Sequence, residues 1–313
     1  MSNSKGFTEA NVPKQTGKSF IVTGANAGVG FEITRVLAAR GARVLLGCRE
    51  QTRALDAIAR IKRMTPNADL VWLPLDLGDL DSVRAVAEIA AKESRIDALI
   101  NNAAIMNPPL TRTTQGFESQ FGVNHLGVFA LTSLLLPKLA ETPGSRVVVT
   151  SSVAHLKAKI DWDDLNADKS YIKTDRYGGS KLANALFFFE LDRRLRAAKS
   201  PVTAIGVHPG IANTSLGRHM GLAQLAGPIV GLLLNSPEMA AWPALLAATG
   251  KVKPGGYYGP TGFGGIRGVA GEAKRAPHAE DPALAKRLWD VSIAMTGIDP
   301  GVRRHHGMFL GRI

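Results

Sequence analysis

Cysteine is nearly absent from this chain of 313 residues, which contains a single one, Cys48. One cysteine can form neither an internal disulfide nor a thiolate metal site, so nothing indicates an oxidising compartment. Long apolar runs are also missing, since residues 1–18 lack a signal-peptide core and no stretch reaches the roughly 18 residues of a membrane-spanning helix. The nearest approach, residues 220–234, is interrupted by Gln224 and Pro228. We therefore expect a cytoplasmic protein without a transmembrane segment.

Patterns for nucleic-acid binding are absent, although the net charge is +12, from 38 Lys and Arg against 26 Asp and Glu. Such a charge can attract nucleic acids or anionic membranes. The arginines are spread along the chain, however, and no basic stripe interleaved with aromatics, helix-turn-helix or zinc pattern occurs. We attribute the charge to solvated surface and to attraction for a phosphorylated cofactor, and expect no nucleic-acid partner.

Two further enzyme classes lack their signatures. No G-x-S-x-G sequence occurs, which argues against a hydrolase with a nucleophile elbow. The histidines show no metal-ligand spacing, so we expect no metal site; those considered are His155, His208, His219 and His278.

Strand and helix patterns alternate through the first two thirds of the chain. Short apolar runs that end at turn residues predict buried parallel strands, and segments of helical periodicity lie between them. The expected strands are residues 18–23, 43–47, 70–75, 96–100, 146–150 and 202–207, and the expected helices are 29–40, 50–64, 80–93, 116–139 and 176–199. This alternation predicts right-handed crossovers and a doubly wound α/β fold of the Rossmann type, with helices on both faces of a parallel sheet.

No linker or repeat interrupts the pattern, so residues 1–313 are expected to form a single dinucleotide-binding catalytic domain. Three stretches are expected to be irregular: an N-terminal arm over residues 1–17, a loop over 155–174, and everything after Pro209. Residues of about 211–250 are expected to form a substrate lid, because residues 220–234 are apolar and contain Gly and Pro.

A glycine-rich turn joins the first expected strand to the first expected helix. Glycine permits positive φ and lets a pyrophosphate approach a helix N-terminus closely, so this turn predicts a dinucleotide site. The glycine spacing differs from G-x-G-x-x-G, which leaves open a turn that binds no cofactor. The candidate residues are Gly24, Asn26, Ala27, Gly28, Val29 and Gly30.

The end of the second strand indicates which dinucleotide binds. An acid there would hold the ribose 2′-hydroxyl of NAD, whereas this strand ends Gly47-Cys48-Arg49, with Arg53 following. Guanidinium groups bind phosphate with two parallel hydrogen bonds. We therefore favour NADP(H), with NAD(H) still possible. Weaker candidates for the cofactor site stand at the ends of the third and fourth strands, namely Asp76, Leu77, Asn102, Ala103 and Ala104.

The run Tyr177-Gly-Gly-Ser-Lys181 places a phenol and an ammonium one helical turn apart. A nearby positive charge lowers the pKa of a phenol, which makes Tyr177 a candidate acid/base. Ser152 follows the fifth strand, where its hydroxyl could bond a substrate oxygen, although it could also cap local backbone. Asn124 interrupts an expected helix, which suggests either a backbone kink or a water held for proton transfer.

These motifs together resemble the classical short-chain dehydrogenase/reductase family, over roughly residues 18–216. The phrases Gly47-Cys-Arg49, Ser180-Lys-Leu-Ala-Asn184 and Val207-His-Pro-Gly210 are similar to its retinol dehydrogenase and WW-domain oxidoreductase branch. The resemblance implies an alcohol dehydrogenase or carbonyl reductase.

The resemblance also implies individual roles. Ser152 would orient the substrate oxygen, Tyr177 would be the acid/base, and Lys181 would lower its pKa and hold the nicotinamide ribose. Asn124 would anchor a water. Asp76 and Leu77 would flank the adenine, Asn102 the adenosine ribose, and Pro209, Gly210 and Thr214 would lie on the cofactor, with Thr214 holding the carboxamide.

An apolar lid favours a hydrophobic alcohol, aldehyde or ketone as substrate, although the same residues could simply pack or touch a membrane surface. Phe187-Phe-Phe189 lies on the Tyr177 helix, which in the family commonly forms a dimer face. We expect a homodimer or homotetramer, and an exposed aromatic in this run would support the homodimer. Two other functions stay open: an epimerase or dehydratase that uses NAD, and a dinucleotide-sensing protein without turnover.

Overall fold

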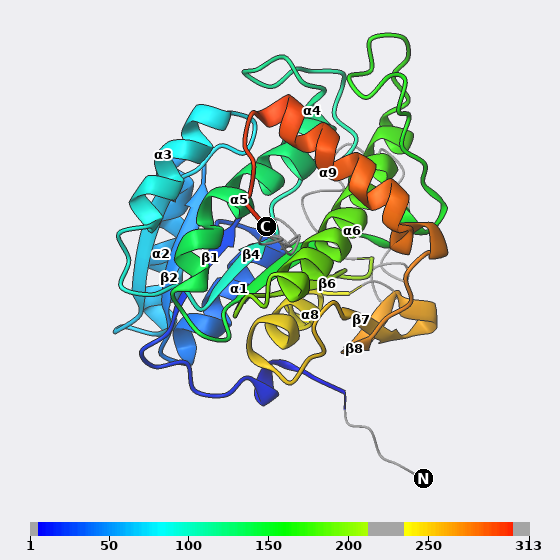
Figure 1. The fold of residues 1–313 in the computed structure, drawn as a ribbon. Coiled ribbons are helices and arrows are strands. Elements are labelled where there is room, and N and C mark those ends of the chain that lie inside the picture. Colours follow the sequence, from blue (N-terminus) through cyan, green and yellow to red (C-terminus); the bar gives the residue numbers. More distant parts are fainter. Residues whose placement is uncertain (1–5, 212–234, 303–313) are drawn as a thin grey trace, which may run out of the picture.

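The computed structural model describes residues 6–211 and 235–302, and a single eight-stranded sheet runs through them (Figure 1). The strand order is β3-β2-β1-β4-β5-β6-β7-β8; β1 to β7 are parallel, and β8 pairs antiparallel with β7. The strands are β1 (Ser19–Thr23), β2 (Arg43–Cys48), β3 (Asp69–Pro74), β4 (Ala98–Asn101), β5 (Arg146–Thr150), β6 (Thr203–Val207), β7 (Tyr257–Gly262) and β8 (Arg267–Glu272). The predicted doubly wound α/β fold is confirmed, with one antiparallel edge strand added.

Helices cover both faces of this sheet. One apolar core joins the sheet to α1 (Gly28–Ala39), α2 (Gln51–Met64) and α8 (Pro237–Thr249). The other joins it to α3 (Leu80–Ala90), α5 (Gly127–Ala140), α6 (Lys173–Ala197) and α9 (Pro282–Thr296), and α4 (Ser119–Phe121) with the π-helical turn η2 (Gly122–Leu126) precedes α5. Short helical turns are η1 (Glu9–Asn11), η3 (Val153–Lys157), η5 (Phe263–Gly265) and η6 (Pro277–Glu280).

The apolar strands follow from this double coverage. In β1, Phe20 and Val22 belong to the core under α1 and α8, whereas Ile21 belongs to the core under α5 and α6. Every position of such a strand is buried, and each buried aliphatic or aromatic side chain contributes about 1.5–3 kcal/mol relative to an exposed one. The strand order reverses direction beside β1 and β4, so a ligand crevice is expected outside their carboxyl ends.

The C-terminal region corrects the sequence prediction. We expected irregular structure after Pro209, but residues 237–302 contain α8, β7, β8 and α9. The last part of the expected lid over residues 211–250 therefore belongs to the core. Helix α8 packs against α1 and its Leu245 is buried. A helix that is apolar all round needs burial on every side. The central part of that lid, residues 212–234 with Thr214, lies outside the described residues.

The N-terminal arm is attached to the far edge of the sheet. The backbone N–H of Phe7 donates to the carbonyl of Ala270 in β8, and Ala270 N–H donates back to Phe7, both at 2.9 Å. Val12 is buried in the core under α1. The described part of the arm, residues 6–17, is therefore packed onto the domain.

The C-terminal helix α9 covers the outer side of α6 (Figure 1). Its Trp289 packs edge-on against Phe129 at 5.4 Å between ring centroids and tilted against Phe187 at 6.0 Å. Phe187 and Phe188 are fully buried, and Phe189 is partly buried against the same core. The aromatic run therefore gives no support to a dimer through α6, and the homodimer or homotetramer stays a prediction.

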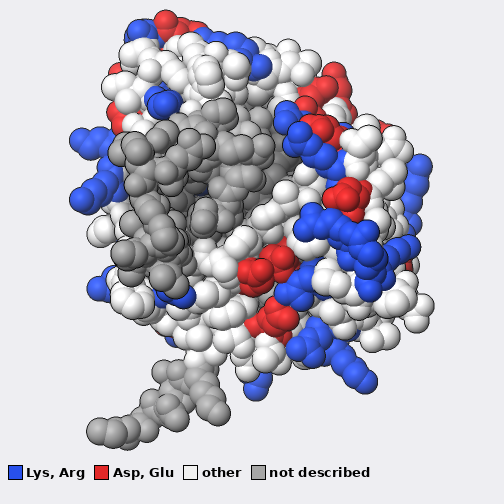
Figure 2. Space-filling model, turned by 180° about the vertical axis from the view of Figure 1, so that it is seen from behind, with Lys and Arg blue, Asp and Glu red and all other residues white. Residues whose placement is uncertain are grey.

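One described stretch, Ser119–Ala140, is long and apolar enough to cross a membrane by length and composition alone. Of its most apolar window, 72% is buried inside the molecule, as expected for a core helix. On the face drawn in Figure 2, basic and acidic side chains are interspersed. The cytoplasmic location expected from the sequence stays a prediction.

Candidate active site

The glycine turn between β1 and α1 has the conformation that the sequence requires. Gly24 and Gly28 have φ of +68° and +54°, a region that other residues rarely adopt. A Cβ on Gly30 would lie 2.2 Å from the carbonyl oxygen of Gly24. The turn is held by Asn102, whose side-chain amide donates to the Thr23 carbonyl at 2.9 Å. The N-terminus of α1 is thereby open to a pyrophosphate.

A cavity of about 470 Å³ extends from this turn along the carboxyl ends of the strands. Most of the residues that the sequence predicts to bind the cofactor line this one cavity. Those that line it are Gly24, Asn26, Ala27, Gly28, Val29, Gly30, Arg49, Arg53, Asp76, Leu77, Asn102, Ala103, Ala104, Tyr177, Lys181 and Pro209. Gly210 lies next to the lining residue Pro209, and Thr214 is outside the described residues.

Arg49 and Arg53 stand at the end of this cavity beyond β2. The Arg49 guanidinium is 4.0 Å from the Asp76 carboxylate and 65% exposed, so that contact is weak. The Arg53 guanidinium pairs with Glu50 at 2.9 Å. Because both guanidinium groups are solvent-exposed and lightly held, they are available to an anionic group in the cavity.

Two of the three polar groups of the predicted reaction, Tyr177 and Lys181, line the other end of the cavity, and Ser152 follows the lining residue Ser151. The Ser152 hydroxyl acts on the titration of Tyr177, and the Lys181 ammonium lies 5.8 Å from the centre of the Tyr177 ring. The Ser152 hydroxyl accepts the Ala154 N–H at 3.2 Å, so its one proton remains for donation to the Tyr177 oxygen or to a substrate oxygen. Lys181 is 2% exposed, and its ammonium donates to the Thr150 carbonyl at 3.3 Å.

The titration of these groups differs in part from the sequence expectation. Removal from water raises the pKa of Tyr177, and the hydrogen bond from Ser152 opposes that rise. The predicted lowering of this pKa by Lys181 is therefore not seen in the protein alone. Burial lowers the pKa of Lys181 to about 8, so its charge is held close to its titration point.

Asn124 lies in the π-helical turn η2, a local irregularity of the kind expected from an asparagine within a helix. Its side-chain oxygen accepts the Ile105 N–H at 2.8 Å, and its amide nitrogen donates to the Ile105 carbonyl at 2.9 Å and to Ser180 Oγ at 3.0 Å. Asn124 thus joins the loop after β4 to α6, close to Lys181. Its role in holding a water stays a prediction.

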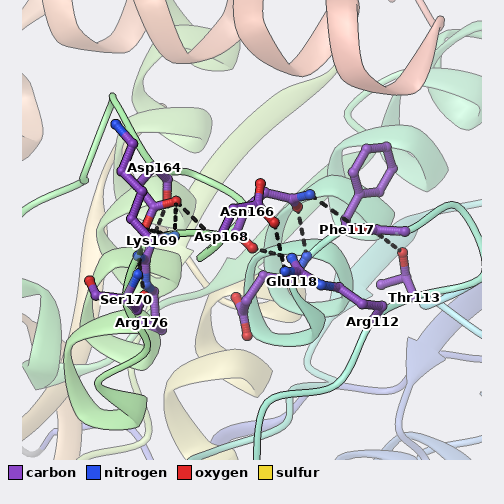
Figure 3. A network of polar contacts seen from close by, with 11 residues as sticks. Arg112, Thr113, Phe117, Glu118, Asp164, Asn166, Asp168, Lys169, Ser170 and Arg176 are labelled. Carbon is purple, nitrogen blue, oxygen red and sulfur yellow. Dashed lines mark hydrogen bonds and ion pairs between the residues drawn. The ribbon is translucent and has the colours of Figure 1, made fainter.

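The loop after β5 is fixed to α6 by a buried carboxylate (Figure 3). Asp164 accepts the backbone N–H groups of Asp168 at 2.7 Å and of Lys169 and Ser170, both at 3.2 Å. It also pairs with Arg176, the residue before Tyr177, at 2.7 Å. Arg176 donates in addition to the carbonyls of Asp164 and Ser170. This network fixes the start of α6, where Tyr177 stands.

A second network ties the same loop to the loop after β4 (Figure 3). Arg112 donates to the carbonyl of Asn166 and, at 2.7 Å, to the Asp168 carboxylate. The Asn166 side chain accepts the Glu118 N–H at 2.8 Å and donates to the Gly116 carbonyl at 3.2 Å. The two loops that flank the active site are therefore joined to each other as well as to α6.

Sequence reasoning missed the part of the cavity that the loop after β4 provides. Residues 111–114 line it, with Ile105, Ser119 and Val123. The Thr114 N–H donates to the Gly78 carbonyl at 3.0 Å, which brings this loop beside the expected adenine residues. A polar loop without periodicity carries no signal for such a contact, because the contact depends on tertiary packing. Within residues 6–211 and 235–302, no cluster of metal-ligating side chains occurs.

A family model described as "short chain dehydrogenase" matches residues 18–224, which span the glycine turn, the cavity and the Ser152–Tyr177–Lys181 group. The chain belongs to the short-chain dehydrogenase family. It is 42% identical to human retinol dehydrogenase 13 over 95% of this chain and 89% of that protein. It is 41% identical to mouse retinol dehydrogenase 14 over 90% of this chain and 86% of that protein.

Solved structures agree with this place in the family. An uncharacterized protein from Mycobacterium Paratuberculosis superimposes with a TM-score of 0.79 at 36% identity, over 94% of this chain and 98% of that one. A short chain dehydrogenase/reductase family protein superimposes with a TM-score of 0.56 at 29% identity, over 75% of this chain and 91% of that one. The predicted retinol dehydrogenase branch of the family is confirmed, and the chain is an oxidoreductase that uses a nicotinamide dinucleotide.

Proposed function

We propose that this short-chain dehydrogenase uses NADP(H) to interconvert a hydrophobic alcohol with its aldehyde or ketone, with Tyr177 as acid/base. The observation that carries the proposal is one cavity lined by Tyr177 and Lys181 at one end and by two exposed arginines at the other, with Ser152 following the lining residue Ser151. A Ser–Tyr–Lys group alone would suit either dinucleotide.

The residues of the cavity fit such a cofactor. Glycines with positive φ at the start of α1 suit the pyrophosphate. Arg49 and Arg53, at a strand end without an acid, suit a 2′-phosphate better than a 2′-hydroxyl. Leu77, Val123 and Lys181 also line the cavity. We expect Leu77 and Val123 to provide apolar surface for an adenine, and Lys181 to hold the nicotinamide ribose.

Each group of the site has a chemical task. When bound, the nicotinamide supplies or accepts the hydride. During reduction, the Tyr177 hydroxyl gives its proton to the carbonyl oxygen, and during oxidation the same oxygen takes that proton back. Ser152 donates its free O–H to the substrate oxygen and orients it. The Lys181 ammonium stabilises the phenolate that Tyr177 becomes, because opposite charges within a few ångströms favour each other.

The substrate class rests on the relatives. Retinol dehydrogenases are named for a hydrophobic alcohol, and the similarity to one of them extends over 89% of its length. We therefore propose hydrophobic alcohols, aldehydes or ketones, and all-trans-retinal and nonanal serve as first probes.

A cofactor titration tests the proposal. Purified protein should bind NADPH at least tenfold more tightly than NADH, and Arg49→Ala should remove most of this difference while leaving NADH binding unchanged, because the lost bonds join charged groups. Arg63→Ala, on α2 but away from the cavity, is the matched control. Equal binding of the two cofactors, or an Arg49→Ala variant that still prefers NADPH, would refute the NADP(H) preference.

A further inference from the structure

His155 is a buried group that the proposed reaction does not use. It lies in the turn η3, three residues after Ser152, and is 1% exposed. Its ring packs edge-on against Tyr257 of β7 at 5.5 Å between centroids. A buried imidazole so close to the reacting groups needs partners for both ring nitrogens.

Both ring nitrogens have a partner, and the partners define one tautomer. The Ala276 backbone N–H, which can only donate, lies 3.3 Å from Nε2, so Nε2 must be the acceptor. The Ser152 carbonyl, which can only accept, lies 2.5 Å from Nδ1, so Nδ1 must carry the proton. The imidazole is therefore neutral and bridges Ser152 to the segment after β8.

The surroundings keep this imidazole neutral. Burial lowers the pKa of His155; the bond to the Ser152 carbonyl opposes this effect, and the nearby His278 and Arg275 add to it. A second proton would have to sit on Nε2, facing the Ala276 N–H. Charging the ring would therefore break the bridge.

The bridge acts on the catalytic serine. β5 ends at Thr150, and the next residue, Ser151, is still bonded through its N–H to the Val207 carbonyl in β6. Ser152 is the first residue past that bond. Its carbonyl accepts both the N–H of His155 at 3.1 Å and Nδ1 of the same residue. Because this carbonyl carbon and the side chain share the Ser152 Cα, fixing the carbonyl limits how far the serine hydroxyl can shift relative to Tyr177.

We propose that His155 is a positioning residue, which holds the Ser152 peptide so that the serine hydroxyl faces Tyr177 and the substrate oxygen. This inference rests on the proposed function, since it assigns Ser152 a task in that reaction. The Nδ1–H of His155 donates to the Ser152 carbonyl. The Ala276 N–H, bonded to Nε2, selects the tautomer that has its proton on Nδ1.

Two substitutions separate the two ring bonds. His155→Asn places an amide nitrogen near the position of Nδ1 and keeps a donor for the Ser152 carbonyl. His155→Gln reaches instead toward the Ala276 N–H and loses that donor. We expect His155→Asn to retain kcat for NADPH-dependent nonanal reduction within about threefold, and His155→Gln to lose about tenfold or more, because small misplacements of reacting groups are costly. Both should bind NADPH as the unsubstituted protein does.

A purely structural histidine would give a different result. Asn and Gln would then lower the melting temperature to similar extents and leave kcat per folded molecule unchanged, which would overturn the proposal. The unsubstituted protein provides a second readout that needs no variant to fold. The ¹⁵N NMR spectrum of labelled histidine should show a neutral ring protonated on Nδ1 at pH 6, and a ring protonated on Nε2, or on both nitrogens, would refute the bridge.

The same experiments keep the two proposals apart. If the unsubstituted protein reduces neither nonanal nor all-trans-retinal with NADPH, the proposed function fails, and the NMR tautomer still decides whether His155 holds Ser152. If it does reduce them while His155→Gln equals His155→Asn, the positioning role alone fails.

Discussion

At the scale of a single residue, Lys181 supplies the charge that the proposed reaction uses, and burial of that charge lowers the stability of the fold. It is almost fully buried, and burial lowers its pKa to about 8 from an ordinary 10.5. Between these two values the unfolded chain binds a proton that the folded one does not, so stability rises with pH there. Below pH 8 the folded protein holds a buried ammonium, and the free-energy cost of removing that charge from water lowers its stability in full.

Lys181→Met should therefore stabilise the protein at pH 7 by about 1–3 kcal/mol while it removes reductase activity. Thermal unfolding at pH 7 and pH 9.5 checks this, with the gain shrinking at the higher pH. Lys157→Met, at an exposed residue of the turn η3, is the control and should change neither quantity. A Lys181→Met variant that is less stable at pH 7 would contradict the assignment.

Gly30 makes the second prediction at this scale. A Cβ there would lie 2.2 Å from the Gly24 carbonyl oxygen, so Gly30→Ala must displace the turn or α1. We expect NADPH binding to weaken at least tenfold and the protein to be destabilised. Gly144→Ala has open space but a φ of +77°, so it should cost only about 1 kcal/mol of strain and leave NADPH binding intact. Calorimetry on both variants tests the comparison.

At the scale of elements, the loop over residues 158–172 depends on one carboxylate. Asp164 accepts three backbone N–H groups and pairs with Arg176, so an asparagine there would replace one acceptor oxygen with a donor and remove the charge that faces Arg176. Asp164→Asn should destabilise the protein by about 1–3 kcal/mol and speed hydrogen exchange at Asp168, Lys169 and Ser170. The neighbouring Asp163→Asn should do neither. Unchanged exchange in Asp164→Asn would show that the loop is held in another way.

The elements also show where sequence patterns are informative. The strands of the first two thirds were predicted because most of them are short apolar runs buried on both faces, as in β1 and β5. β7 and β8 were missed, because the glycine and proline within them are typical of loops and their pairing is decided by distant contacts. α8 was missed for another reason, since a helix buried all round has no periodicity to detect.

The predicted site residues divide in the same way. Gly24, Gly28 and Gly30 were identifiable because a strand-to-helix turn dictates glycine locally. Residues 111–114 were not, because their place in the cavity depends on networks between two loops. His155 carried a sequence signal only as a histidine near Ser152; its tautomer follows from Ala276, more than a hundred residues away.

At the scale of the whole molecule, buried neutral histidines predict sensitivity to acid. Burial lowers the pKa of His125 to about 3 and of His208 to about 4, from 6.5. As the pH falls below 6.5 the unfolded chain takes up protons that the folded one cannot, so each group removes about 1.4 kcal/mol per pH unit until its folded pKa is reached. The melting temperature should fall steeply between pH 6.5 and pH 4. His208→Gln should flatten the decline, and an unchanged slope would exclude His208 as a cause.

The position of α9 on the outer side of α6 leads to a prediction about assembly. Since Trp289 covers Phe129 and Phe187, the face of α6 that faces α9 is not available to a second copy. Any homodimer must use another surface, so Trp289→Ala should destabilise the protein by about 3–5 kcal/mol without changing its mass in light scattering. A dimer that dissociates in this variant would place the interface next to α9.

The central claim is that Tyr177 moves the proton in an NADP(H)-dependent reaction, and Tyr177→Phe tests it most directly. The variant keeps the ring that lines the cavity and removes only the hydroxyl. NADPH binding should stay within about threefold of the unsubstituted protein, while reduction of all-trans-retinal or nonanal should fall by about 10²–10⁴-fold. Reduction at the unsubstituted rate, with NADPH still bound, would contradict the account.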